Sequence, residues 1–154
     1  MKEEIFRFLA LIEMDINCEK ELVKWAEEKL TNNVETKSLV LLAGLSEKEY
    51  TNAIELFNKV VEELNIQRPN IKDVLLFYSK LIARDILENK IDPNDGCDII
   101  RNISIHLDYP DELAGFHLLA HSQYDHEKIG IYAKDLIPDI KDEAKELINK
   151  IKTV

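Results

Sequence analysis

Apolar residues recur at intervals of three and four along most of the chain, which is the spacing that one face of an α-helix requires. The clearest case begins at Ser46 and ends near Asn65. Its apolar positions in register are Tyr50, Ala53, Ile54, Phe57, Val60, Val61 and Leu64. Ser46 and Glu49 have the spacing of a capping box, in which each residue satisfies a free N–H group of the first helical turn. The pattern predicts an amphipathic helix that starts at Ser46.

Two further helices follow from their start signals. Asn70 precedes a segment, reaching to about Asn89, that is apolar around more than half of its circumference, which predicts a central helix. Asp92 and Pro93 are typical of a helix start, because Asp accepts a hydrogen bond from the first turn and Pro at the first position needs no N–H partner. The residues expected to face inward from this helix are Cys97, Ile100, Ile103 and Leu107.

Three segments are less regular. The run SLVLLAGL, residues 38–45, is too apolar for one face to be wet, so we expect a short buried helix there. The polar run HSQYDHE, residues 121–127, predicts a loop after a short helix that Tyr109 and Pro110 open. A last helical region runs from about Glu127 to Lys150, and Pro138 must kink or divide it.

These elements predict an all-α fold. We expect about eight or nine helices of modest length in one domain over residues 1–154, arranged as an irregular bundle or as HEAT-like stacked helix pairs. The chain has only four glycines and four prolines, which favours helices over the many turns of an all-β fold. No segment predicts a strand.

The net charge of the chain limits the kinds of partner that we expect. Thirty Asp and Glu residues against 20 Lys and Arg residues leave a net charge of −10. Such a field repels phosphate backbones, so we expect no nucleic-acid partner. It attracts a basic protein surface, mainly by raising the association rate. Acidity also keeps a protein soluble without any partner, and that explanation stays open.

Acidic residues cluster in the second half of the chain, where they suggest a partner-binding edge. Several of them lie at predicted helix starts, where negative charge is favourable beside the helix dipole, so a purely structural role is the alternative. Tyr109, Tyr124 and Phe116 lie near this edge and are equally compatible with interface anchors and with core residues. The candidate partner-binding residues are Asp92, Asp95, Asp98, Asp108, Asp111, Glu112, Tyr109, Tyr124 and Asp125.

The histidines are the most specific candidates for a metal site in the sequence. His117 and His121 are four residues apart and share a helix face, as a zinc site requires, and Asp125 and His126 follow closely. The first histidine is not followed by Glu, so there is no HExxH motif, and apolar neighbours also suit a structural histidine. Histidines without a metal are the favoured interpretation, and the sequence predicts no cofactor and no catalytic residue.

The cysteines and the N-terminal segment suggest a cytoplasmic protein. Cys18 and Cys97 are far apart in sequence and form no CxxC motif, so we expect reduced, buried thiols. The N-terminal stretch MKEEIFRFLALIEMD carries acids where a secretory signal would carry basic residues. No run approaches the roughly 20 apolar residues of a membrane-spanning helix, so no membrane association is expected.

Several stretches together resemble a loosely defined group of small, acidic, all-helical bacterial proteins, which include immunity proteins of contact-dependent and other polymorphic toxin systems. The resemblance covers about residues 38–150, and its most distinctive element is the pattern I-x-x-x-I-L-x-x-x-I-D-P-x-x-G from Ile82 to Gly96. The other stretches are LVLLAGLSEKEYTNAIELFNKVVEELNI, YPDELAGFHLLAHSQYD and DEAKELINK. The resemblance implies that the chain protects a cell by binding a toxin domain, and it identifies no contact residue.

Three functions are compatible with these observations. The first is a non-catalytic immunity protein that masks the basic surface of a bacterial toxin, for example a nuclease. The second is a helical scaffold or adaptor for another cytosolic protein. The third is a metal-dependent enzyme that uses His117, His121 and His126.

Overall fold

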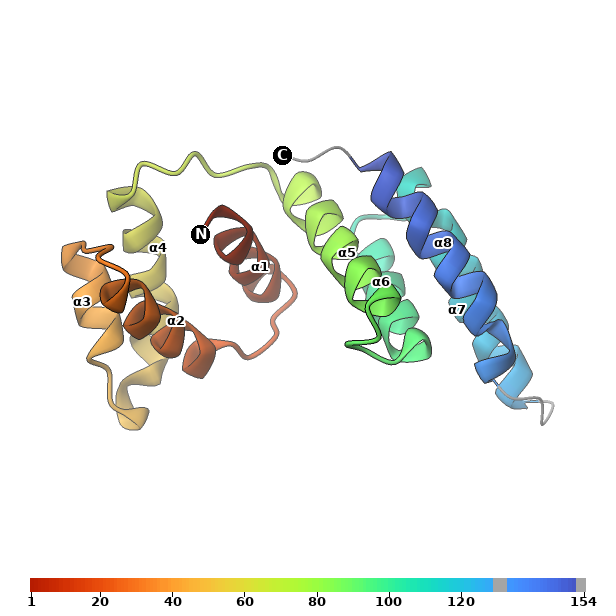
Figure 1. Cartoon of the computed structure of the whole chain (residues 1–154), viewed down its shortest axis with the longest axis horizontal. Coiled ribbons are helices and arrows are strands. Elements are labelled where there is room, and N and C mark those ends of the chain that lie inside the picture. The colour runs from red at the N-terminus through yellow and green to blue at the C-terminus, as the bar shows by residue number, and fades with distance from the viewer. Residues whose placement is uncertain (129–132, 152–154) are drawn as a thin grey trace. The chain divides into compact units, whose positions relative to one another are not determined.

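The computed structural model describes residues 1–128 and 133–151, and in these residues it contains helices and no strand (Figure 1). The α-helices are α1 (Lys2–Glu13), α2 (Glu19–Thr31), α3 (Lys37–Ala43), α4 (Ala53–Glu63), α5 (Ile71–Leu87), α6 (Pro93–His106), α7 (Ala114–Lys128) and α8 (Ile137–Lys150). Short 3₁₀ helices lie at Glu47–Asn52 (η1), Asp111–Leu113 (η2) and Ala133–Leu136 (η3). The all-α class predicted from the sequence is confirmed.

The chain divides into two compact units. Unit 1 is Met1–Asn70 and contains α1 to α4, and unit 2 is Ile71–Val154 and contains α5 to α8. The single domain expected over residues 1–154 stays a prediction.

Unit 1 is held together by an aromatic cluster. Phe8 of α1, Trp25 of α2 and Phe57 of α4 contact one another edge to face, with ring centroids 5.6 to 5.8 Å apart. Such pairs stabilise a core by about 0.5–1.5 kcal/mol each beyond the apolar area that they bury. Helix α3 packs against both α2 and α4, and the Ser38 N–H and hydroxyl donate to the Glu63 carboxylate at 3.0 and 2.8 Å.

Unit 2 is built from two antiparallel helix pairs. α5 packs against α8, α6 packs against α7, and α6 also contacts α5 (Figure 1). Lys80 in the middle of α5 donates to the Ile151 carbonyl just after α8, while Lys141 near the start of α8 donates to Asn89 just after α5. Gly96 lets α6 approach α5 closely, since a Cβ atom there would lie 2.7 Å from the side chain of Ile86.

Most helices end on asparagine or aspartate instead of glycine. The second residue after the helix adopts the left-handed conformation, with φ between 54° and 61°, at Asp15, Asn33, Asn65, Asn89 and Asp108. Asn and Asp tolerate this conformation better than other residues that carry a side chain. The chain can therefore use short helix connections although it contains only four glycines.

The start signals predicted at Ser46 and Asp92 are both confirmed. The Ser46 N–H and hydroxyl both donate to the Glu49 carboxylate, at the start of η1, which continues directly into α4. The Asp92 carboxylate accepts from the N–H groups of Asn94 and Asp95 at the start of α6. The proline at position 138 lies in the first turn of α8 and separates it from η3, as expected.

The expected burial of residues 38–45 is wrong on one face. α3 buries only Ser38, Leu39 and Leu42, while the side chains of Val40 and Leu41 are 46% and 52% exposed. A seven-residue helix makes only two turns, so its contacts with α2 and α4 cover one face.

The loop expected at residues 121–127 is also wrong, because α7 continues through this run to Lys128. The polar residues suit a helix that is wet on one side, and Gln123 turns inward and is only 4% exposed. The polar residues of this run therefore mark the exposed face of a helix and not the end of one.

Among the described helices, none is both long enough and apolar enough to cross a membrane.

Candidate functional site

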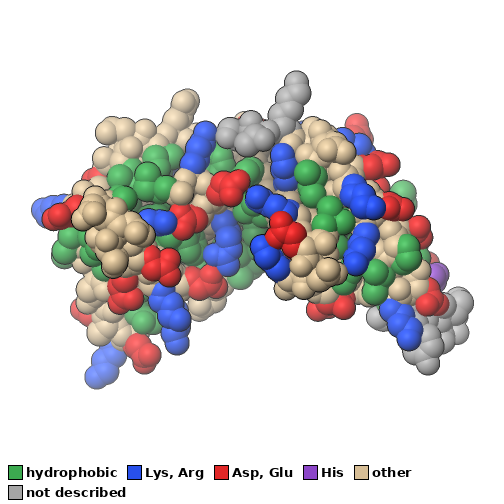
Figure 2. Space-filling model, viewed as in Figure 1, with side chains coloured by type: hydrophobic (Ala, Val, Ile, Leu, Met, Phe, Trp, Pro, Cys, Tyr) green, Lys and Arg blue, Asp and Glu red, His purple; other side chains and the backbone are tan. Residues whose placement is uncertain are grey.

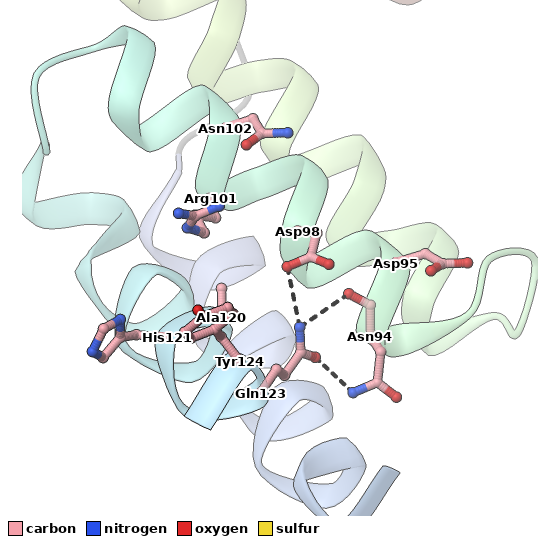
Figure 3. Close-up of a pocket in the computed structure, with 9 residues that line it drawn as sticks. All are labelled: Asn94, Asp95, Asp98, Arg101, Asn102, Ala120, His121, Gln123 and Tyr124. Carbon is pink, nitrogen blue, oxygen red and sulfur yellow. Dashed lines mark hydrogen bonds between the residues drawn. The ribbon is translucent and has the colours of Figure 1, made fainter. Parts of the chain in front are cut away.

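The strongest candidate site lies on the α6–α7 hairpin, which we define as residues 92–126. The two helices run antiparallel, so the start of α6 lies beside the end of α7. A groove of about 570 Å³ opens between them (Figure 3). It is lined from α6 by Asn94, Asp95, Asp98, Arg101 and Asn102, and from α7 by Ala120, His121, Gln123 and Tyr124.

Gln123 fixes one end of this groove. Its amide N–H group donates to the Asp98 carboxylate at 3.2 Å and more weakly to the Asn94 carbonyl at 3.4 Å, while its oxygen accepts from the Asn94 side chain at 2.6 Å (Figure 3). The Asn94 side chain also donates to the Ala133 carbonyl at 2.9 Å. These bonds hold the two helices in register, so the side chains along the groove project from a rigid frame.

The hairpin is far more acidic than the rest of unit 2. Residues 92–126 contain seven acidic residues and one basic residue, Arg101. By contrast α8 contains four acidic and three basic residues, and Figure 2 shows acidic and basic side chains interspersed on the side of unit 2 where α5 and α8 lie in front. The negative field of unit 2 is therefore concentrated on the hairpin.

Large apolar side chains are exposed on the same hairpin. Tyr109 is 56% exposed, Leu118 67% and Tyr124 63%, and Ile105 is also exposed. Phe116, in contrast, is fully buried. The sequence left both roles open for these aromatics, and the structure places Phe116 in the core and the two tyrosines on the surface.

Tyr109 is held in an unusual backbone conformation. Both Asp108 and Tyr109 have positive φ, 57° and 59°, and the Tyr109 N–H donates to the Ser104 carbonyl at 2.8 Å. A left-handed conformation costs roughly 1–2 kcal/mol for a residue with a side chain. The Tyr109 ring packs edge to face on His117 at 4.9 Å and still exposes more than half of its surface.

The structure brings the predicted partner-binding residues together in two groups. Asp92, Asp95, Asp98, Tyr124 and Asp125 lie around the groove end of the hairpin. Asp108, Tyr109, Asp111 and Glu112 lie at the other end, roughly 20 Å away along α6 at 1.5 Å per residue.

Like Asp98, which accepts from Gln123, Asp92 and Glu112 already have structural partners. Asp92 caps α6, which is the structural role that the sequence offered as the alternative. Glu112 pairs with Lys72 of α5 at 2.9 Å, and this hydrogen-bonded ammonium group lowers the pKa of the Glu112 carboxyl. Both carboxylates contribute to the field of the hairpin, but their first role is to stabilise the fold.

Sequence reasoning missed several groove residues. Asn94, Arg101, Asn102 and Gln123 are ordinary polar residues at helical spacing, and no motif distinguishes them. The only available signal was the acidic cluster, which located the hairpin but not the groove within it.

The described residues around the histidines do not form a metal site. His117 packs against Tyr109, while His121 is exposed and lies 3.8 Å from Asp125. Among the described residues, no group of three or more His, Cys, Asp or Glu side chains has the arrangement of a metal site.

Both cysteines are buried and unpaired with each other, as expected. Burial raises the pKa of the Cys18 thiol to about 11 and that of Cys97 to about 12. Neighbouring carboxylates contribute to both of these raised values, so neither thiol forms a thiolate readily at neutral pH.

No protein-family model matches the chain, and no curated protein or solved structure does.

Proposed function

We propose that the chain is a non-catalytic binding domain that engages a basic protein surface through its α6–α7 hairpin. The observation that carries this proposal is the concentration of seven acidic residues and exposed tyrosine side chains on one hairpin with a single basic residue. Interfaces commonly combine aromatic anchors with complementary charge around them.

The charges and the apolar groups of the hairpin would have different effects on binding. The excess of carboxylates steers a basic partner toward the hairpin and raises the association rate, an effect that salt screens. Tyr109, Leu118 and Tyr124 provide apolar area that becomes buried in the complex, and burial of such groups slows dissociation. We therefore expect the affinity for the partner to fall as the salt concentration rises, mainly through slower association.

The resemblance to immunity proteins suggests which partner this is. A nuclease toxin presents a basic surface to hold phosphate, and an acidic binding domain can mask that surface without any chemistry of its own. We propose that the chain neutralises such a toxin.

The test is co-expression with the product of the gene immediately upstream of the one that encodes this chain. We expect the two proteins to co-purify and the chain to restore growth to cells in which the upstream product is toxic. A variant that carries Asp95→Lys and Asp125→Lys should lose both effects, whereas the α8 variant Asp142→Lys/Glu146→Lys, with the same charge change, should retain them. Absence of a complex together with absence of protection would refute the toxin-neutralising role.

A second candidate, a scaffold or adaptor, is favoured by a partly apolar groove in unit 1. The groove has a volume of about 360 Å³ and is lined by Leu41, Leu45 and Leu56. Polar side chains of Glu49, Asn52 and Glu55 complete its lining. Val40 and Leu41 also expose apolar surface without a covering element in unit 1. An adaptor that uses this groove would lose its partner when Leu41 is replaced by Glu and would keep it in the Asp95→Lys/Asp125→Lys variant, the reverse of the result expected for the hairpin.

A further inference from the structure

Arg101 differs from the other arginines of the chain in having no partner among the described residues. The chain contains four arginines, and among the described residues three of them interact with the protein. Arg7 pairs with Glu21 at 2.8 Å and Arg68 donates to Asn58 at 2.6 Å, while Arg84 also has a partner. Arg101 is half-buried and makes no ion pair or hydrogen bond with any residue that the structure describes.

Its position in the groove makes this unexpected. Asp98 lies one helical turn before Arg101 and Asp95 lies almost two turns before it, so carboxylates are close in sequence and face the same groove (Figure 3). Asp98 instead accepts from Gln123 at 3.2 Å. The guanidinium group therefore remains available on the α6 side of the groove, opposite Ala120 and Tyr124 of α7.

A half-buried guanidinium group favours one kind of ligand. Arginine stays charged at any physiological pH, and its planar fork of N–H donors matches a carboxylate, which it binds with two parallel hydrogen bonds. Partial burial removes some of its water, so a matching anion gains more there than on an open surface. Phosphate of a nucleic acid has a similar shape, but the seven carboxylates of the hairpin repel a polyanion.

We propose that the groove binds a partner segment of mixed charge, in which a basic residue contacts Asp95 or Asp98 and a nearby acidic residue pairs with Arg101. This inference rests on the proposed function and names the chemistry of the partner. Along α6, Arg101 lies about 4.5 Å beyond Asp98 and about 9 Å beyond Asp95, at 1.5 Å per residue. In an extended segment, which advances about 3.3 Å per residue, the two charges would be one to three residues apart.

Such an arrangement gives specificity as well as affinity. A partner with only basic residues leaves Arg101 half-buried, unpaired and close to like charge. A partner whose acidic residue is in register converts the same group into an ion pair. Attraction at the aspartates and repulsion at Arg101 together distinguish one basic protein from another.

The test is selection of binding peptides from a random 12-residue display library, with the whole chain as the target. We expect enriched peptides to contain a basic residue and, one to three positions away, an acidic residue. The strongest of them, made synthetically, is then measured against variants of the chain. Arg101→Gln should weaken its binding about tenfold and Arg101→Glu more, because the acidic residue loses its partner and then meets like charge.

The matched control is Lys145→Glu on α8, which changes the net charge as Arg101→Glu does and should leave binding nearly unchanged. A peptide whose acidic residue is replaced by Gln should bind the wild type and the Arg101→Gln variant equally, and circular dichroism should show that each variant is folded. Enriched basic peptides without an acidic residue, bound equally by Arg101→Gln, would overturn the role of Arg101 and leave the proposed function intact. Enriched peptides that bind the Asp95→Lys/Asp125→Lys variant as well as the wild type would overturn the proposed function itself.

Discussion

The groove between α1 and α2 in unit 1 and the groove between α6 and α7 in unit 2 are both lined by charged side chains, yet their charges are used differently. In the first groove, of about 260 Å³, Arg7 pairs with Glu21 and Lys29 beside it pairs with Glu4, both at 2.8 Å. In the second, Arg101 is without a partner among the described residues, although Asp95 and Asp98 line the same groove.

The difference is not one of net charge. Unit 1 contains 14 acidic and nine basic residues, and unit 2 contains 16 and 11, so each carries the same excess of five acids. Charges that neutralise one another within a groove stabilise the local structure slightly and present little field to a partner. A charge that is left unpaired, such as that of Arg101, contributes little to the fold and remains available for binding. The comparison therefore assigns a structural role to the α1–α2 groove and a binding role to the α6–α7 groove.

The largest expected difference concerns the tryptophan of one groove and the tyrosine of the other. Trp25 lines the α1–α2 groove but is only 4% exposed, and it belongs to the aromatic cluster of unit 1. Trp25→Ala should lower the free energy of unfolding by about 3–5 kcal/mol, as is usual for removal of a buried aromatic. Tyr124→Ala should lower it by less than about 1 kcal/mol, because that ring is mostly exposed. Urea denaturation of both variants measures the contrast, and equal losses would contradict it.

Charge reversal should have the next largest effect, and on binding instead of stability. Asp95→Lys together with Asp125→Lys should weaken binding of the selected mixed-charge peptide at least about a hundredfold, which corresponds to about 2.7 kcal/mol. Asp142→Lys with Glu146→Lys on α8 is the matched control and should change binding less than about threefold. Calorimetric titration at low salt measures both, and a similar loss in the two variants would mean that only the net charge matters.

A substitution at Tyr109 distinguishes the effect of its backbone strain on stability from the effect of its ring on partner binding. Tyr109→Gly removes the exposed ring and relieves the positive φ, so the free energy of unfolding should change by no more than about 1 kcal/mol. Binding of the selected peptide should nevertheless weaken about tenfold, as expected for loss of an aromatic anchor. Thermal denaturation and titration of the same protein sample measure the two effects. Unchanged binding would show that Tyr109 is not part of the interface.

The smallest effect is the pH dependence of the Glu112–Lys72 ion pair. Lys72 lowers the pKa of Glu112 in the folded state, so ionised Glu112 stabilises the fold at pH values above the ordinary 4.5 of a free glutamate. This contribution is lost as the pH falls through the lowered pKa, because the folded protein must then take up the proton. Glu112→Gln should therefore melt slightly below the wild type at pH 7, and the two melting temperatures should converge below about pH 4. A constant difference across this range would argue against the ion pair.

The fold was largely predictable because helix starts are local. The caps at Ser46 and Asp92 and the break at Pro138 depend on residues a few positions apart, and the sequence identified all three. Burial depends on distant packing, which explains the error at Val40 and Leu41. The polar run at residues 121–127 was mistaken for a loop for the same reason, since inward-facing Gln123 finds its partner in Asn94, 29 residues earlier.

The site was predictable only in outline. Acidic residues could be counted in the sequence, and they located the hairpin. Arg101 could not be recognised, because its importance lies in having no partner among the residues that the structure describes, which only the packing of α6 on α7 reveals. The role of Glu112 was equally hidden, since Lys72 lies 40 residues away in sequence.

The most direct test of the binding role of the hairpin is a titration of the isotopically labelled chain with the selected peptide, followed by amide NMR shifts. Because both units carry the same excess of acids, unspecific attraction of a basic peptide would perturb amides in both. We expect the shifts to concentrate at residues 94–109 and 117–126. Shifts of similar size along the α1–α2 groove, or confined to it, would contradict the account.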